Sequence, residues 1–144
     1  MKSRHTEKGY LILIEPGEEI VSTISAFVVA NNIAAGTFTA IGAVSSVDLG
    51  YYELAEKEYH WKNFQGTIEI ASGIGNIAWL DDDTPIVHFH GVFSGSDFVA
   101  FAGHVRHAIV SAACEVVLID YRDRLLRKMD KTIGLNLWEC DKKN

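Results

Sequence analysis

Hydrophobic residues near the start of the chain follow two different spacings in turn. Residues 10–14 (Tyr-Leu-Ile-Leu-Ile) form a short apolar run that Pro16-Gly17 ends, which is typical of a β-strand. Between residues 18 and 29, apolar residues recur at the spacing of one helix face. Glu18 and Glu19 stand where the positive end of a helix favours acidic side chains. The pattern predicts a strand followed by a helix.

The remaining apolar stretches predict strands. The first covers residues 37–44 and continues through 46–54, with a potential bulge at Gly42. The others cover residues 58–70, 73–80, 86–93, 98–105, 111–121 and 132–140. Short polar turns such as residues 81–83 separate most of them, so neighbours should pair antiparallel. The chain is therefore predicted to be an α+β protein. It has a central, mostly antiparallel sheet and one main helix near the N-terminus. Its 144 residues should form a single domain with a core over about residues 10–140.

Residues 20–47 contain no charged side chain and are long enough to cross a bilayer. Polar residues and glycine interrupt this stretch, and its periodicity changes halfway, so we interpret it as a buried helix followed by a buried strand. The charged start of the chain has no signal-peptide pattern.

The chain has two cysteines, Cys114 and Cys140, which are too few for a disulfide scaffold. We therefore expect both to be buried thiols in a reducing compartment, which predicts a cytoplasmic protein.

The net charge of −6 is divided unevenly along the chain. Between residues 9 and 105, two basic residues oppose twelve acidic ones. A protein that contacts phosphates of nucleic acid usually presents a basic face, and only the segment 122–131 could supply one. If this segment contacts nucleic acid, the binding should be weak, and the phosphate contacts would come from Arg122, Arg124, Arg127 and Lys128. The alternative for this segment is a solvated loop.

The sharpest chemical signal is the pair His88 and His90, which share one face of a predicted strand because side chains alternate along it. Two imidazoles side by side on an apolar strand suit a divalent metal ion, zinc above all. His104 follows on the next predicted strand, beyond the turn at 94–97, and can lie beside the pair. Three histidines with an open fourth position resemble a catalytic zinc site. The alternative is that these histidines pack in the core.

Two carboxylates interrupt strands that otherwise look buried. Glu69 and Glu115 are therefore candidate catalytic residues, as a general base or a fourth metal ligand. The alternative for each is an edge position or an ion pair. His107 would share the face of His104 only in a helix, and His60 is expected on the surface. The chain contains no nucleophile elbow, phosphate-binding loop or dinucleotide fingerprint.

Several segments resemble, in the same order, those of the PPC domain (plants and prokaryotes conserved) over about residues 10–140. They include Gly66-Thr-Ile-Glu-Ile-Ala71, Pro85-Ile-Val-His-Phe-His90, Ala102-Gly-His-Val105 and Ala112-Ala-Cys-Glu-Val116. The resemblance implies an α+β fold with a central antiparallel sheet, a homotrimer, and a zinc triad at His88, His90 and His104. The fold is also similar to that of acetolactate decarboxylases, which hold zinc with a His-x-His pair and a later histidine.

Members of the PPC family are commonly labelled DNA-binding. In plant members the contact comes from an AT-hook with an Arg-Gly-Arg core, which this sequence lacks. Thr67 replaces the arginine of the plant pattern Gly-Arg-Phe-Glu-Ile-Leu. Both departures argue against DNA as a partner, and so does the excess of acidic residues between positions 9 and 105. Three functions remain: a DNA-associated or regulatory trimer with a metal site, a metal-dependent lyase or hydrolase acting on a small polar substrate, or a non-catalytic metal or small-molecule binding module.

The predicted helix at 18–29 bears on the oligomeric state. The face opposite its apolar residues carries serine, alanine and valine and no charge. A helix that is uncharged all round is usually covered on both sides. In a chain of this length one cover is the sheet, and a second subunit is the natural candidate for the other.

Overall fold

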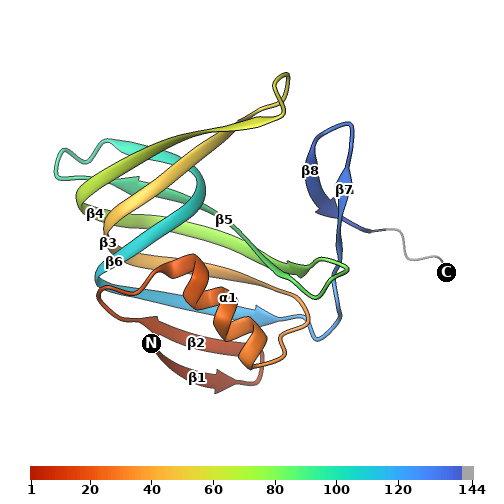
Figure 1. The fold of residues 1–144 in the computed structure, drawn as a ribbon. Helices are drawn as coiled ribbons and strands as arrows, with labels where there is room; N and C mark the ends of the chain where they lie inside the picture. Colours follow the sequence, from red (N-terminus) through yellow and green to blue (C-terminus); the bar gives the residue numbers. More distant parts are fainter. Residues whose placement is uncertain (141–144) are drawn as a thin grey trace.

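One helix and two antiparallel sheets make up the fold, which a computed structural model describes over residues 1–140 (Figure 1). The elements, in chain order, are β1 (Lys2–Thr6), β2 (Gly9–Ile14), α1 (Ile20–Ala30), β3 (Gly36–Glu53), β4 (Glu58–Trp79), β5 (Pro85–Ser94), β6 (Ala100–Asp120), β7 (Arg127–Asp130) and β8 (Leu135–Trp138). The predicted α+β class, with a mostly antiparallel sheet and one helix near the N-terminus, is confirmed.

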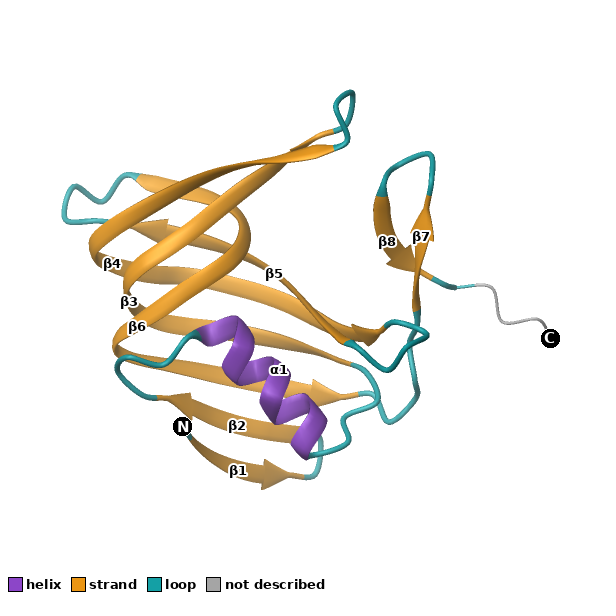
Figure 2. Ribbon diagram, viewed as in Figure 1, coloured by secondary structure: helices purple, strands orange, loops and turns teal. Residues whose placement is uncertain are grey.

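The larger sheet has the strand order β1-β2-β6-β3-β4-β5, and β6 also pairs with β5. Strands β3, β4, β5 and β6 therefore close on themselves, while β1 and β2 extend the sheet beyond β6 (Figure 2). β2 and β3 flank β6 on opposite sides, so α1 crosses over one strand between them. The closure brings the start of β6 beside β5.

β4 and β6 are much longer than the sequence pattern indicates, because bulges interrupt the alternation of apolar residues. The stretches predicted as separate strands at 58–70 and 73–80 form the single strand β4, and most of the residues at 98–105 and 111–121 belong to β6. β3 is continuous across the expected bulge, as predicted. The register shifts next to Gly42, where the bulge was expected. Gly42 has φ +147°, and a Cβ there would lie 2.1 Å from the carbonyl oxygen of Ala113. Only glycine fits this bend.

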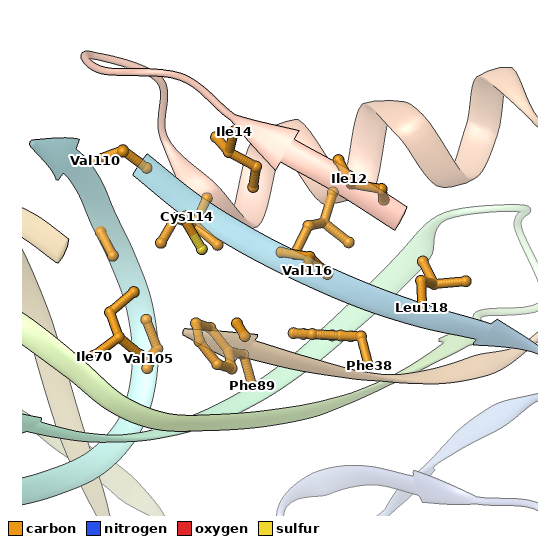
Figure 3. Packing of buried hydrophobic residues seen from close by; sticks show 14 of the residues in the cluster. Ile12, Ile14, Phe38, Ile70, Phe89, Val105, Val110, Cys114, Val116 and Leu118 are labelled. Carbon is orange, nitrogen blue, oxygen red and sulfur yellow. The ribbon is translucent and has the colours of Figure 1, made fainter. Parts of the chain in front are cut away.

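The core lies between α1 and one face of the sheet. Glu19 begins the helix by accepting hydrogen bonds from the backbone nitrogens of Val21 and Ser22 at 2.9 and 2.6 Å. The buried side chains of α1 belong to a cluster that includes Phe38 and Phe89, whose ring centroids are 5.4 Å apart (Figure 3). These two rings join β3 to β5, so the core fixes the strand that carries His88 and His90.

The other face of the larger sheet is open. Its exposed apolar side chains come from four adjacent strands and include Leu11, Ile41, Ile74, Val117 and Ile119. Ile41 is 55% exposed and Val117 is 47% exposed. The outer side of α1 exposes smaller residues, with Val29 as its largest apolar side chain. The larger uncovered apolar surface is thus on the sheet rather than on the helix.

The smaller sheet is the hairpin of β7 and β8, which stands at the end of the larger sheet (Figure 1). The sequence predicts its first half as a charged connection. Its base is held where the backbone nitrogen of Trp79 donates to the carbonyl oxygen of Leu125 at 2.9 Å. Its tip is held where the Tyr52 hydroxyl donates to the carbonyl oxygen of Ile133 at 2.7 Å. The hairpin therefore spans from the end of β4 to the end of β3.

The uncharged stretch at 20–47 is a helix followed by a strand, as predicted. Within residues 1–140, no helix has both the length and the apolar character needed to cross a membrane. The two cysteines differ from the prediction in one respect: Cys114 is buried, but Cys140 is exposed. Cys140 follows β8, shortly after Trp138.

Candidate metal centre

Three histidines meet where β5 and β6 pair. His88 and His90 lie on β5, with Phe89 between them pointing into the core, and His104 is the pairing partner of His90 on β6. The ring centroids are 5.0, 5.2 and 5.3 Å apart, and one nitrogen from each ring lies within 4.8 Å of the others. Three nitrogens that bind one tetrahedral zinc ion are roughly 3.4 Å apart. The triangle is close to the size that one metal ion needs.

A glycine lets His104 reach the pair. Gly103 pairs with Gly91, and a Cβ at position 103 would lie 2.9 Å from the carbonyl oxygen of Gly50 on β3. The absence of a side chain therefore allows β6 to lie against β3 and β5 together. The side chain of Ala102, the residue before Gly103, is exposed and does not crowd the site.

All three imidazoles are held in the neutral form. Burial lowers the pKa of His88 to about 4, and the positive charge of Arg127 adds to the effect. Burial, reinforced by the neighbouring rings, also lowers the pKa of His104 to about 4. The pKa of His90 is lowered by burial as well. Since a metal ion binds the neutral ring, the cluster needs to lose no proton at neutral pH.

The β7–β8 hairpin closes one side of the cluster with Arg127. The guanidinium donates from Nη1 to the carbonyl oxygen of Asn136 at 2.7 Å and from Nη2 to the Asn76 side-chain oxygen at 2.8 Å. Nη2 is also 3.2 Å from Nδ1 of His88. On another side, Tyr59 and Trp61 of β4 lie with their ring centroids 5.0 and 5.9 Å from that of His104. The site is a recess bounded by strands, aromatic rings and one guanidinium.

The residues present fit a zinc-type ion. Nδ1 of His104 is a buried nitrogen with no hydrogen-bond partner within residues 1–140. A buried polar atom in this state costs about 1–3 kcal/mol. A metal ion bound among the three rings would satisfy such a cluster, and three imidazoles suit zinc and similar divalent ions while leaving one coordination position open.

The structure places the two candidate catalytic glutamates away from the histidines. Glu69 is exposed on β4 and pairs with Ser94 at the far end of β5. Glu115 is exposed on β6, opposite Leu13 of β2. Among the described residues, no carboxylate joins the group formed by the three histidines.

The other histidines lie outside the cluster. His107 is exposed on β6 and pairs with Asp48 of β3. Nε2 of His60 is 2.9 Å from a carboxylate oxygen of Glu56, and the His60 ring stacks on Tyr51. Both positions agree with the expectation from the sequence.

The four basic residues considered for phosphate contact do not form one exposed face. Arg122, Arg124 and Lys128 are exposed, and each is already engaged by a carbonyl oxygen or an acidic side chain. Arg127 is only 8% exposed and turns toward His88. It does not face solvent as the sequence interpretation expected, because the hairpin folds its side chain inward.

Sequence reasoning does not identify Arg127, Asn76, Tyr59 or Trp61 as parts of the site. A signal for Arg127 exists in residues 130–134 (Asp-Lys-Thr-Ile-Gly), which have the composition of a turn. A hairpin around that turn pairs Arg127 with Trp138, as the structure has it. Nothing in the sequence indicates that this hairpin lies against β5.

Known proteins resemble the whole chain. The Plants and Prokaryotes Conserved (PCC) domain matches residues 1–122. A structure from Bacteroides thetaiotaomicron named a "putative DNA binding protein" is 30% identical, has a TM-score of 0.92 and covers 96% of each chain. A metal-containing protein from Archaeoglobus fulgidus is 36% identical, with a TM-score of 0.82 over 96% of this chain and 99% of that one. Comparison with curated proteins gives no match.

A more distant likeness concerns the fold alone. Acetolactate decarboxylase from Bacillus subtilis is 14% identical, with a TM-score of 0.59 over 83% of this chain and 56% of that one. The similarity between the two folds that the sequence implies is thereby confirmed. The PCC match spans most of the chain, and the Archaeoglobus structure exceeds 30% identity over nearly all of it. This chain belongs to the Plants and Prokaryotes Conserved domain family.

Proposed function

We propose that the protein is a metal-binding member of its family, in which His88, His90 and His104 hold one divalent ion of the zinc type and the open coordination position receives a small ligand. The observation that carries the proposal is the unpartnered Nδ1 of His104 within a triangle of neutral imidazoles. The relative from Archaeoglobus fulgidus, described as metal-containing, supports it. When bound, such an ion supplies a Lewis acid at its open position.

Ligand binding is favoured over catalysis because of what surrounds the histidines. For the lyase or hydrolase that the sequence leaves open, a carboxylate beside the metal is the expected proton-transferring group. Glu69 and Glu115 are the candidates for that role, and both lie elsewhere on the sheet. Within residues 1–140 no other carboxylate stands in the cluster. A binding module is therefore the function that the geometry supports best.

Metal analysis of protein purified without a histidine tag tests the proposal. We expect about one zinc or similar divalent ion per chain after dialysis against a buffer that contains trace zinc. A metal-free protein after that treatment overturns the proposal.

The pH at which the metal is released provides a prediction of its own. Protons compete with the metal for the same nitrogens, and a free imidazole takes up its proton near pH 6.5. Because the pKa values of His88 and His104 are lowered to about 4, protonation should compete only at lower pH. Occupancy should stay high at a pH well below 6.5 and fall as the pH approaches 4. Equilibrium dialysis at fixed total zinc measures the metal occupancy at each pH. Half-release of the metal near pH 6.5 would contradict the lowering of the histidine pKa values by burial.

The proposal includes a homotrimer, as the family resemblance implies. Support comes from the open sheet face with its exposed Leu11, Ile41, Val117 and Ile119, since monomers rarely leave a broad apolar patch uncovered. The face continues to the metal site, because Ile74 on it pairs with His90. Subunits that meet on this face would therefore border the metal.

DNA association is the second candidate function. The observation in its favour is the name of the Bacteroides thetaiotaomicron relative, which is similar over nearly the whole of both chains. The charge of this chain works against it, since acidic residues outnumber basic ones by 19 to 13. Counterion release from phosphates then contributes little.

Duplex DNA should accordingly bind weakly and without sequence preference. The exposed Arg122, Arg124 and Lys128 offer few phosphate contacts, so we expect a Kd of about 10⁻⁴–10⁻⁶ M at physiological salt, weakening steeply as salt rises. Fluorescence anisotropy with a labelled duplex measures it, and the triple change to glutamine should remove the binding. A nanomolar complex that persists at ~200 mM salt contradicts this prediction.

A further inference from the structure

The guanidinium beside the histidines is not in an ordinary structural ion pair. Arg127 is the single buried charged or polar residue within residues 1–140. Its hydrogen-bond partners are Asn136, Asn76 and His88, all of them neutral. Its Nε is buried without a partner in the described chain. None of the ion pairs found between residues 1 and 140 includes Arg127.

A buried positive charge without a negative partner is costly, because desolvation is not repaid by attraction. Burial accordingly lowers the pKa of Arg127. A divalent ion among three neutral imidazoles would add two further positive charges beside it. No carboxylate of the described chain stands in the cluster to balance them. An anion from outside would remove this electrostatic strain.

We propose that Arg127 binds the carboxylate of a small organic acid, with one carboxylate oxygen at the open coordination position of the metal. This inference rests on the metal site of the proposed function. A guanidinium presents a planar fork of N–H donors that matches a carboxylate, and the charged hydrogen bonds are about twice as strong as neutral ones. Asn136, Asn76 and His88 engage only some of the N–H donors of the guanidinium, so others remain for a carboxylate.

The pocket beside Arg127 indicates the kind of acid. A recess of about 330 Å³ is lined by Asn76, His88, Arg127, Leu137 and Trp138. Its volume is at the small end of the range for ligand sites. Leu137 and Trp138 of β8 provide an apolar wall beside the guanidinium, whose central carbon is 5.9 Å from the centroid of the Trp138 ring, and both side chains are exposed to an incoming molecule. This combination suits a short organic acid with an apolar tail better than inorganic phosphate, which would leave the apolar wall without a contact.

Arg127 also helps to attach the hairpin, through Asn136 and Asn76. A divalent ion prefers a carboxylate to a neutral amide by itself, so that preference alone does not reveal the role of Arg127. A purely structural Arg127 would affect stability but not the affinity of the folded, metal-loaded site for an anion, so the change in that affinity when Arg127 is replaced separates the two roles.

The test uses the full chain loaded with Co²⁺, whose visible absorption reports a change of ligand at the metal. Propionate should change the spectrum saturably, while propionamide should need at least about tenfold higher concentration. Arg127→Gln should keep one cobalt per chain and weaken propionate by at least about tenfold, and Arg127→Lys should fall between it and the wild type. Arg4→Gln, an exposed arginine on β1 at the opposite edge of the sheet from β5, should change nothing.

The outcomes are distinct. Failure to bind cobalt overturns the metal site and this inference together. Bound cobalt with equal affinity for propionate and propionamide, or undiminished propionate binding by Arg127→Gln, overturns the role of Arg127 and leaves the metal site standing. Tighter binding of inorganic phosphate than of propionate overturns the carboxylate as ligand class. Should Arg127→Gln not fold, Arg127→Lys, which keeps the charge and loses the planar fork of donors, decides: undiminished propionate binding by that variant overturns the role of Arg127.

Discussion

Replacing His104 by alanine should remove the metal almost completely and leave the protein folded. Two imidazoles hold a divalent ion far less well than three, and even the loss of an outer partner of a ligand costs roughly 10- to 100-fold in metal affinity. We expect at least that upper figure here. His104 lies at the rim of the core, and its Nδ1 makes no hydrogen bond within the described chain. Zinc content after dialysis and circular dichroism measure the two expectations.

His107→Ala is the matched control. His107 lies three residues further along β6, is exposed and pairs with Asp48, so its loss should leave the metal unchanged. His60→Ala on β4 should behave in the same way. If His107→Ala removes the metal and His104→Ala does not, the assignment of the three histidines is wrong. Removal of the metal by a chelator without loss of the assembly would indicate a functional rather than a structural ion.

The histidine cluster is predictable from the sequence because it depends on short-range rules. His88 and His90 share a face as a result of strand alternation alone. His104 needs one further element, the turn after β5, and the register then sets it opposite His90. The single helix is equally local, since its periodicity and the glutamate at its start lie within a dozen residues.

The parts that escape prediction depend on long-range geometry. Bulges in β4 and β6 shift the alternation, so one bent strand has the pattern of two. β1 is exposed over nearly its whole length and carries no apolar alternation that would predict a strand. Arg127 belongs to a charged segment whose pattern is that of a solvated loop, and only the attachment of the β7–β8 hairpin turns it toward His88.

A charge introduced on the open sheet face should separate the proposed trimer. The wild-type protein should sediment at micromolar concentration with the mass of three chains. Val117 lies on β6 between Leu11 of β2 and Thr39 of β3, near the middle of the exposed apolar face. Val117→Glu would bury an unpaired carboxylate in each subunit of the assembly, at an effective cost of several kcal/mol per ion. Since Val117 is 47% exposed in the single chain, the variant should fold and sediment as a monomer.

Val29→Glu on α1 is the control that separates the two candidate faces. The sequence points to the uncharged outer side of the helix as the covered surface, and Val29 is its most exposed large residue. On the structure the sheet offers more exposed apolar side chains, so Val29→Glu should remain a trimer. If Val29→Glu dissociates and Val117→Glu does not, the helix face is the interface. A wild-type protein that sediments as one chain contradicts the trimer altogether, and the apolar sheet face then needs a different partner.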